Sequence, residues 1–326
     1  MLANRDSMTA PETTSHQTPD SSLELEILQP GSLWQRVRSQ TRYALDCGAL
    51  QPIETNCHYL EQAGIRFLVR ILNNLSRKDK ARKAQAKQSA QSGKDFNPFL
   101  PYETDLFVSN LSETHLCLLN KFNVVPYHLL VITRAYEEQE TWLNLADFAA
   151  LWHCMREVEG LAFYNSGAIA GASQRHKHLQ LVPFPLDGQT MNPAVPIEPL
   201  IAQANLQEGV GTLPHFDFRH AIAPLGLPND LSTAEAAEKL LACYQQLFDA
   251  AGIPSEQRSD RPTCAYNLLV TRAWMLLVPR SQECYGEISI NSLGFAGALL
   301  VRNPIQLESV KQGGPFELLK QVSLHP

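Results

Sequence analysis

The chain has 326 residues and is 44% hydrophobic, which is enough apolar material for one large domain or two. Its formal net charge of −6 argues against a general nucleic-acid-binding protein, because affinity for a polyphosphate backbone needs an excess of cations. No apolar run approaches the roughly 20 residues of a membrane helix, the polar N-terminus lacks a signal-peptide pattern, and seven scattered cysteines fit a reducing compartment better than a disulfide scaffold. We therefore expect a globular, cytoplasmic protein that binds neither nucleic acid nor a membrane.

The N-terminal region combines polar segments with one predicted helix. Residues 1–22 are rich in Ser and Thr, include Pro, Gln and Asp, and are predicted to form a disordered leader. Apolar spacing predicts a helix over 33–44 with Ser32 as its N-cap, whereas the mixed spacing over 69–75 defines no element. Residues 77–95 are polar and rich in cations, so we expect a mobile basic loop. This loop is either a solvated linker or a lid whose lysines meet a polyphosphate.

The rest of the chain alternates short β-rich runs with two helical patterns. In the first half we expect antiparallel strands at 106–108, 115–119 and 128–133. A helix is predicted over 147–162, with Asn144 or Asp147 as its N-cap, and a turn at 165–171 leads from it into a further strand. Several prolines after residue 183 indicate an irregular connector. In the second half we expect a helix over 232–251, with Gly252 just beyond its end, and strands at 265–271, 274–278 and 297–301. No exact internal repeat is visible.

The most informative short motif comes at the start of the strand that follows residue 171. His176, His178 and Gln180 are spaced at i, i+2 and i+4, which puts their side chains on one face of an extended strand. A neutral imidazole is a nucleophile near neutral pH, and a carboxamide binds a phosphoryl oxygen without adding negative charge. The motif therefore indicates histidine chemistry on an anion.

Two simpler explanations of the motif stay open. A bare His-x-His is more often a half-exposed strand, and it is also a spacing of metal ligands. No pair of cysteines forms Cys-x-x-Cys, which weakens a zinc site. The small-residue turn before the motif favours phosphate binding, because backbone amides can approach a phosphate closely there. This turn contains Asn165, Gly167, Gly171, Ala172, Ser173 and Gln174.

Four longer segments point to a family. They are LLNKFNVVPYHLLVITRAYEEQ, FYNSGAIAGASQRHKHLQLVPFP, YNLLVTRAWMLLVPRS and INSLGFAGALLVR, in this order. Together they resemble the diadenosine tetraphosphate (Ap4A) phosphorylases, or ATP adenylyltransferases, of the histidine-triad (HIT) superfamily, over about residues 60–310. The His-x-His-x-Gln pattern alone is shared with the galactose-1-phosphate uridylyltransferases. The resemblance implies an α+β fold with a HIT-like antiparallel β-sheet core flanked by helices, a catalytic region over 23–200 and a C-terminal adenylyltransferase region over 201–326.

The resemblance also implies roles for single residues. It places the nucleophile that attacks the α-phosphorus at His178, its orienting neighbour at His176 and a phosphoryl-binding amide at Gln180. The substrate-binding positions that it implies are Lys78, Asn120, Lys121, His128, Asn165, Gly171, Ala172, Ser173, Gln174, Asn291, Ser292, Leu293, Ala298 and Arg302. Two of them depart from the expected pattern, since Ala298 stands in place of methionine and Arg302 in place of lysine.

The implied reaction is phosphorolysis of Ap4A by inorganic phosphate to ADP and ATP, through a covalent adenylyl-histidine. The reverse reaction, turnover of adenosine phosphosulfate, purine selectivity and oligomeric state stay open. We expect no cofactor bound by the protein itself, although Mg2+ can accompany the substrate phosphates.

Three other functions remain as alternatives. A dinucleoside polyphosphate hydrolase is disfavoured by Gln180, because triad hydrolases carry a third histidine at that position. A hexose-1-phosphate uridylyltransferase is disfavoured by the missing Cys-x-x-Cys motif and by the non-proline residues Lys177 and Leu179. A non-catalytic nucleotide sensor is disfavoured because His178 is retained together with its neighbours.

Overall fold

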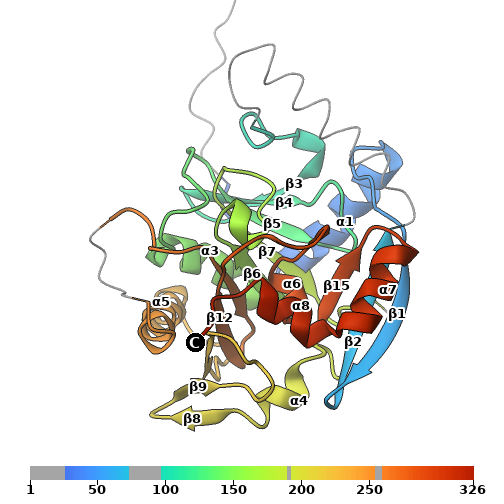
Figure 1. The fold of residues 1–326 in the computed structure, drawn as a ribbon. Coiled ribbons are helices and arrows are strands. Elements are labelled where there is room, and N and C mark those ends of the chain that lie inside the picture. Colours follow the sequence, from blue (N-terminus) through green and yellow to red (C-terminus); the bar gives the residue numbers. More distant parts are fainter. Residues whose placement is uncertain (1–25, 73–96, 189–191, 254–258) are drawn as a thin grey trace, which may run out of the picture.

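The computed structural model describes residues 26–72, 97–188, 192–253 and 259–326 of the chain. Its centre is a ten-stranded sheet in which all neighbouring strands are antiparallel (Figure 1). In spatial order the strands are β3 (Phe107–Asn110), β4 (His115–Leu119), β5 (Leu129–Thr133), β7 (His178–Pro183), β6 (Gly160–Asn165), β11 (Tyr266–Val270), β12 (Trp274–Pro279), β10 (Ala221–Pro224), β9 (Val210–Thr212) and β8 (Asn205–Gln207). With the helices that flank it, this sheet confirms the predicted α+β fold.

The two halves of the sheet repeat one topology. From the central β6–β11 pair outward, the strand order is β6-β7-β5-β4-β3 on one side and β11-β12-β10-β9-β8 on the other. In each half three strands precede a helix, α3 (Leu145–Met155) or α5 (Thr233–Ala250), and two strands follow it. The repeat therefore lies in the path of the chain, although the sequence shows no exact repeat.

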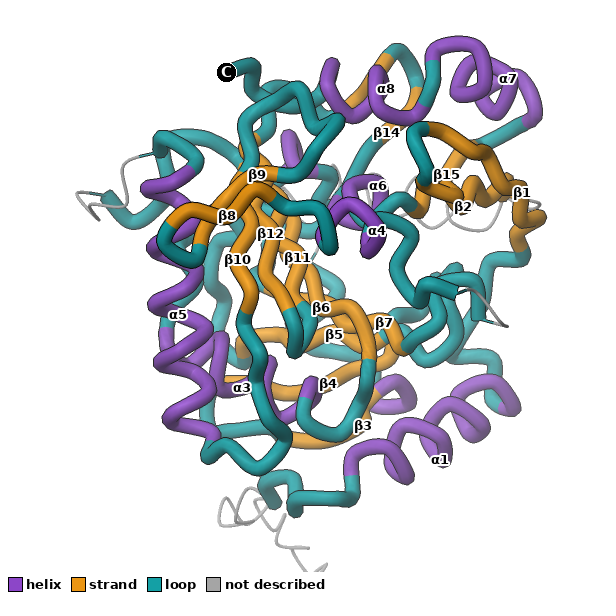
Figure 2. The backbone as a smooth tube through the Cα atoms, turned by 90° about the horizontal axis from the view of Figure 1, so that it is seen from below, coloured by secondary structure: helices purple, strands orange, loops and turns teal. Residues whose placement is uncertain are grey.

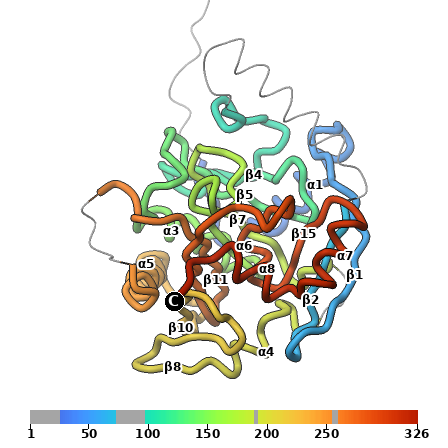
Figure 3. The backbone as a smooth tube through the Cα atoms, viewed as in Figure 1, coloured from blue at the N-terminus to red at the C-terminus, as the bar shows by residue number. Residues whose placement is uncertain are grey.

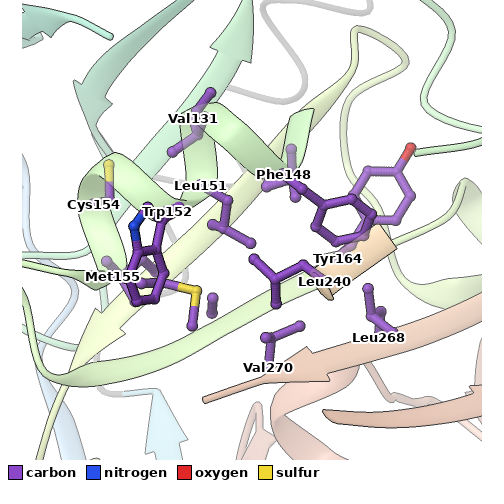
Figure 4. Close-up of a cluster of buried hydrophobic side chains, with 14 of the residues drawn as sticks. Val131, Phe148, Leu151, Trp152, Cys154, Met155, Tyr164, Leu240, Leu268 and Val270 are labelled. Carbon is purple, nitrogen blue, oxygen red and sulfur yellow. The ribbon is translucent and has the colours of Figure 1, made fainter. Parts of the chain in front are cut away.

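Helices α3 and α5 cover one face of the sheet (Figure 2). Figure 4 shows Phe148 and Leu151 from α3 and Leu240 from α5 packed against strand residues such as Tyr164 and Leu268. Helix α1 (Leu33–Asp46) extends this layer beside β3 and buries Leu33, Val37 and Ala44. Because the central strands are covered on both faces, their residues form continuous apolar runs instead of alternating with polar ones.

A smaller sheet and the C-terminal helices cover part of the opposite face. The smaller sheet contains β1 (Thr55–Gln62), β2 (Ile65–Leu72) and β15 (Ala298–Val301), and Figure 3 shows the C-terminal segment in red beside the blue N-terminal hairpin. The helices are α6 (Ser292–Phe295), α7 (Pro304–Gly313) and α8 (Pro315–Gln321). The remaining short elements are η1 (Thr104–Leu106), η2 (Ala168–Ala170), α4 (Glu198–Ile201), β13 (Cys284–Tyr285) and β14 (Ile288–Ser289).

The rest of this second face is packed more thinly. Over β4 and β5, Phe99 closes a small apolar cluster with Leu116, Leu118, Leu130 and Ile132. Leu130 and Ile132 lie directly opposite Gln180 and His178 on the neighbouring strand. The histidine motif therefore lies on the part of the sheet that, among the described residues, the loop around Phe99 covers.

The helix predicted over 147–162 is wrong in its second half. The helix ends at Met155, and residues 160–165 form strand β6, which lies between β7 and β11. The run GLAFYN is buried on both faces, so its periodicity does not distinguish a strand from a helix. At the other end of α3, Asn144 is the N-cap, and Asp147 completes a capping box with it.

The N-cap predicted at Ser32 is confirmed in position, but the Ser32 side chain makes no capping hydrogen bond. The Ser32 hydroxyl donates to the carbonyl of Gln29, and the Glu157 carboxylate accepts from the backbone N–H groups of Gly31 and Leu33 instead. A carboxylate at this end is favoured by the positive end of the helix dipole. Residues 69–72, for which the sequence predicts no element, belong to strand β2.

Two predicted segments lie outside the described residues, namely the leader over 1–22 and the basic loop over 77–95. The predicted helix over 232–251 is confirmed as α5, with Ser232 as its N-cap. Within the described parts of the chain, no helix is both long and apolar enough to cross a membrane.

Candidate active site

His178 is the first residue of β7 and is buried with its ring on the thinly covered face. Its Nδ1 atom donates a hydrogen bond to the carbonyl oxygen of His176 at 2.8 Å. The proton is therefore on Nδ1, and the lone pair is on Nε2, for which the described residues supply no hydrogen-bond partner. Burial lowers the pKa of His178 to about 4, so the imidazole is neutral at physiological pH. A neutral, oriented imidazole with an open Nε2 is suited to nucleophilic attack.

His176 orients His178 through its backbone, whereas its own ring is held by other residues. Asn97 donates to Nδ1 of His176 at 2.9 Å, and Nε2 of His176 lies 2.8 Å from the carbonyl oxygen of Thr133. The ring of Phe99 packs edge-on against both histidines, with centroid distances of 5.5 Å. The sequence analysis did not single out Asn97 or Phe99, although both follow directly on the basic loop where the composition changes.

Gln139 is a second residue that the sequence analysis missed. Its side-chain oxygen accepts from the backbone N–H of His178 at 2.8 Å, and its amino group donates to the carbonyls of Asn165 and His178 at 2.8 and 3.1 Å. The amide therefore sits between the ends of β6 and β7 and satisfies backbone groups that lack a strand partner there. The segment containing Gln139 is one of the four motifs, but a glutamine among glutamates gave no signal of burial.

Gln180 lies on the same face as His178, as the i, i+2 spacing predicts. Its side-chain oxygen is 3.0 Å from Nε2 of His128, and Nδ1 of His128 is 3.2 Å from the amino group of Asn120. The structure thus brings three of the predicted site residues into one hydrogen-bonded chain. Lys121, the neighbour of Asn120, instead forms an ion pair with Glu103 at 2.6 Å.

The glycine-containing turn lies between β6 and β7. Gly171 has a φ of 88°, and a Cβ atom there would come within 2.9 Å of both Asn291 and the carbonyl of Ile290. Gly167 also has a positive φ, and a Cβ atom there would meet Glu140. The turn therefore needs glycine at both positions. Of the other predicted positions in this turn, Ala172 and Gln174 are half-buried and Ser173 is exposed.

Asn165 and Ser292 are buried and hydrogen-bonded to each other. The side-chain oxygen of Asn165 accepts from the backbone N–H of Ser292 at 2.9 Å, from its hydroxyl at 2.7 Å and from the amino group of Asn267 at 2.8 Å. The same amino group also donates to the carbonyl of Ala170 in the turn. The contacts of Asn165 and Ser292 among the described residues are therefore structural: they hold the glycine-containing turn in place.

Arg280 extends this buried network into the C-terminal region. Its guanidinium donates to the side chain of Asn267 at 2.5 Å and to the carbonyl of Ile290 at 2.9 Å, and its Nε donates to the carbonyl of Val322. Burial lowers the pKa of Arg280 to about 10, which leaves the group charged at neutral pH. The C-terminal segments are thus held to the catalytic turn by polar contacts as well as by apolar packing.

The other substrate-binding residues predicted in the C-terminal region lie around α6 and β15. Asn291 caps α6 by accepting from the backbone N–H of Leu293, and Leu293 is half-buried. Ala298 is on β15 beside Leu68 of β2, and Arg302 is exposed just beyond that strand. Ala298 therefore belongs to the smaller sheet, and Arg302 follows directly after it, so neither lies in the sheet that contains His178. Lys78 lies outside the described residues.

The reverse side of β7 holds a buried ion pair. Lys177 is 1% exposed, and its ammonium lies 2.8 Å from Asp147 and 3.0 Å from Glu137. Burial alone would raise the pKa of Asp147, but hydrogen bonds from His115 and Lys177 and the Lys177 charge hold it below its ordinary value. Lys177, which lies between the two histidines in the sequence, therefore has a structural role as the cation of this buried ion pair. Within the described residues, no group of three His, Cys, Asp or Glu side chains could hold a metal ion.

The fold and the site define an α+β protein in which a buried, neutral histidine lies near a glutamine amide and a glycine-containing turn, an arrangement suited to nucleotidyl transfer. Two family models match the chain, the Ap4A phosphorylase N-terminal domain over residues 24–203 and the ATP adenylyltransferase C-terminal domain over residues 214–325. The chain therefore belongs to the Ap4A phosphorylase family, and the resemblance drawn from the four motifs is confirmed.

Individual relatives agree with the family models. Diadenosine 5',5'''-P1,P4-tetraphosphate phosphorylase 2 of Saccharomyces cerevisiae is 29% identical over 255 residues, which is 71% of this chain and 76% of that protein. Protein APA1 of the same yeast is 29% identical over 205 residues, 59% of this chain and 63% of that protein.

Solved structures support the fold. The crystal structure of yeast Ap4A phosphorylase Apa2 matches 93% of this chain and 99% of its own with a TM-score of 0.71 and 22% identity. The same yeast enzyme in complex with Ap4A matches with a TM-score of 0.68.

Proposed function

We propose that this protein transfers an adenylyl group from Ap4A to inorganic phosphate, and that Nε2 of His178 carries the adenylyl group between the two steps. The observation that carries this proposal is the hydrogen bond from Nδ1 of His178 to the carbonyl of His176, which leaves Nε2 unprotonated and without a hydrogen-bond partner among the described residues. The family models and the names of the yeast relatives support Ap4A as the donor.

The reaction needs two displacements at one phosphorus atom. In the first, the Nε2 lone pair attacks the α-phosphorus of Ap4A, a nitrogen–phosphorus bond forms, and the bond to the bridging oxygen breaks to release ATP. In the second, a phosphate oxygen attacks the same phosphorus, the bond to Nε2 breaks, ADP leaves and the phosphate proton passes to solvent. His178 bears a positive charge while it holds the adenylyl group, and the His176 carbonyl stabilises the Nδ1 proton at that stage.

Charge on the transferred phosphoryl group needs positioned donors. The amino group of Gln180 and the backbone of the turn at residues 171–174 are the nearest candidates in sequence and fold, and Lys121 becomes available if the substrate draws it from Glu103. A Mg2+ ion bound to the substrate phosphates would supply further charge without a dedicated protein cage.

Two other functions lead to different products. A hydrolase would pass the adenylyl group to water, and a uridylyltransferase would turn over UDP-hexose. An amide at Gln180 gives no general base for activating water, which favours phosphate as the acceptor.

The test is incubation of the purified protein with Ap4A, with and without inorganic phosphate, followed by ion-exchange separation of ATP, ADP and AMP. We expect equal ADP and ATP, formed only when phosphate is present. AMP and ATP formed regardless of phosphate would replace this function with hydrolysis.

We also propose that the protein acts in the cytoplasm. The support is that every described cysteine is a free thiol, as in a reducing compartment. Fractionation of cells that express the tagged chain would test this location.

A further inference from the structure

The hydrogen bonds around Gln180 form a chain whose direction is set by the backbone. The N–H of Phe122 can only donate, and it points at Oδ1 of Asn120 at 3.3 Å. The other end of the Asn120 amide is therefore its amino group, which faces Nδ1 of His128 at 3.2 Å. An amino group has no lone pair to offer, so Nδ1 of His128 must accept and its proton must be on Nε2.

The same logic fixes the orientation of the Gln180 amide. Nε2 of His128 donates, so the atom of Gln180 that lies 3.0 Å away must be the oxygen. The amino group of Gln180 then points the other way and makes no hydrogen bond to any described residue. Gln180 is half-buried on the face of the sheet that carries His178, so this amino group is left to bind a phosphoryl group held by His178.

We propose that Asn120 and His128 are positioning residues that turn the Gln180 amide so that its amino group, and not its oxygen, meets the transferred phosphoryl group. This inference rests on the proposed adenylyl transfer. A reversed amide would place oxygen lone pairs against an anionic oxygen, whereas the observed one offers donors to the charge that develops there. The resemblance implies that Asn120 and His128 touch the substrate, while the geometry gives both a role through Gln180.

His176 is oriented by the same arrangement of hydrogen bonds as His128, which gives an internal comparison. The N–H of Phe99 donates to the oxygen of Asn97, and the amino group of Asn97 faces Nδ1 of His176. Both histidines are thus predicted to carry their proton on Nε2, whereas His178 carries it on Nδ1. One spectrum should therefore distinguish the ring of His178 from the rings of His128 and His176.

The first test is therefore made without substrate. Nitrogen-15 NMR of the histidine-labelled protein, assigned with single histidine variants, reports which ring nitrogen bears the proton. We expect the Nε2–H form for His128 and the Nδ1–H form for His178. An Nδ1–H form of His128 in the wild-type protein would overturn the proposal, whether or not the protein turns over Ap4A.

The second test uses the isosteric change Asn120→Asp. A carboxylate can only accept a hydrogen bond, so it favours the tautomer of His128 with the proton on Nδ1, and the Gln180 amide loses the donor that fixes its orientation. We expect kcat to fall about tenfold or more with little change in KM, since a donor to a developing charge is affected and not ground-state binding. Asn205→Asp on the exposed edge strand β8 makes the same chemical change away from the site and should keep the parent kcat.

The double variant Asn120→Asp with Gln180→Leu decides whether Asn120 acts through Gln180. We expect Gln180→Leu alone to lower kcat by about a hundredfold and the added Asn120→Asp to lower it little further. If the losses of kcat in the two single variants multiply in the double variant, or if the Asn120 variant raises KM at unchanged kcat, Asn120 contacts the nucleotide directly. Either result would overturn the proposal. Turnover by the wild-type protein in the same assay separates this outcome from failure of the proposed function.

Discussion

The two halves of the ten-stranded sheet follow the same path, but they differ in the connection between the last two strands of each half. In the first half, residues 166–177 form the glycine-containing turn and deliver His178 to the first position of β7. In the second half, residues 271–273 form a tight turn, and Trp274 takes the first position of β12 inside an apolar cluster. One topology thus supports both a strand that begins with the proposed nucleophile and a strand that begins with a packing residue, and the two connections differ in length.

The first residues of these two strands, His178 and Trp274, are also held by different kinds of contact. His178 is fixed by hydrogen bonds from Gln139 and to His176, which set its position and its tautomer. Trp274 is fixed mainly by burial, with its backbone N–H donating to the hydroxyl of Thr271. We therefore expect changes in the first half to lower activity more than stability, and changes in the second half to do the reverse.

The largest expected effect is the loss of turnover in His178→Ala. Removing the nucleophile should lower kcat by at least about a thousandfold, because the nitrogen proposed to carry the adenylyl group is lost. Phosphorolysis assays measure this loss, and the dissociation constant for Ap4A should change little. Transfer near the parent rate would contradict the assignment of the nucleophile.

The matching change in the second half is Trp274→Ala. Trp274 is 4% exposed, so truncation should lower the free energy of unfolding by about 3–5 kcal/mol while the folded fraction keeps its kcat. Urea denaturation and an assay at low temperature measure the two quantities. A large loss of kcat with little loss of stability would break the proposed division between the halves.

Acid should affect stability through His178. The pKa of His178 is about 4 in the folded protein, compared with an ordinary value of 6.5. Between these values the unfolded chain binds a proton that the folded protein does not, so the free energy of unfolding falls as the pH is lowered through this window. The expected contribution is on the order of 3 kcal/mol.

The variant His178→Asn isolates this effect, because it lacks the titrating group while the other histidines remain. Urea unfolding at several pH values between about 7 and 4 should show a smaller decline for the variant than for the wild type. Parallel declines would mean that His178 is not buried in its neutral form.

The smallest of these effects is expected for Gln139→Leu. The change leaves the N–H of His178 without its acceptor and removes one of two donors to the carbonyl of Asn165, which should cost about 1–3 kcal/mol of stability. It should also lower kcat, because the nucleophile loses part of its alignment. Gln312→Leu, in the exposed part of α7, is the matched control and should change neither quantity appreciably. A kcat equal to that of the wild type would remove Gln139 from the positioning of His178.

Much of the fold was predictable where a local signal was strong. The strand at 115–119 and the helix now called α5 have clear apolar patterns, and the capping residues of α3 and α5 are visible in the sequence. Strand β6 was not predictable, because a run buried on both faces has no period. The N-cap position of α1 was predicted, but its acceptor Glu157 was not, because Glu157 is far away in the sequence.

The candidate site likewise contains residues that the sequence predicted and residues that only the structure reveals. The spacing of His178 and Gln180 placed them on one face from sequence alone, because a strand alternates its side chains. Asn97 and Gln139 act through single hydrogen bonds across the fold, and no periodicity or composition marks such contacts. The roles of Asn165 and Ser292 as partners of each other likewise depend on tertiary contacts.

The central claim is that His178 carries the adenylyl group, and the most direct measurement is to trap that intermediate. The protein is incubated with Ap4A without phosphate, quenched under alkaline conditions, digested and analysed by mass spectrometry for an adenylyl group. The account predicts the group on the peptide that contains His178, and its release as ADP when phosphate is added before quenching. Phosphorolysis that proceeds with no adduct, or with the adduct on another residue, would contradict the account.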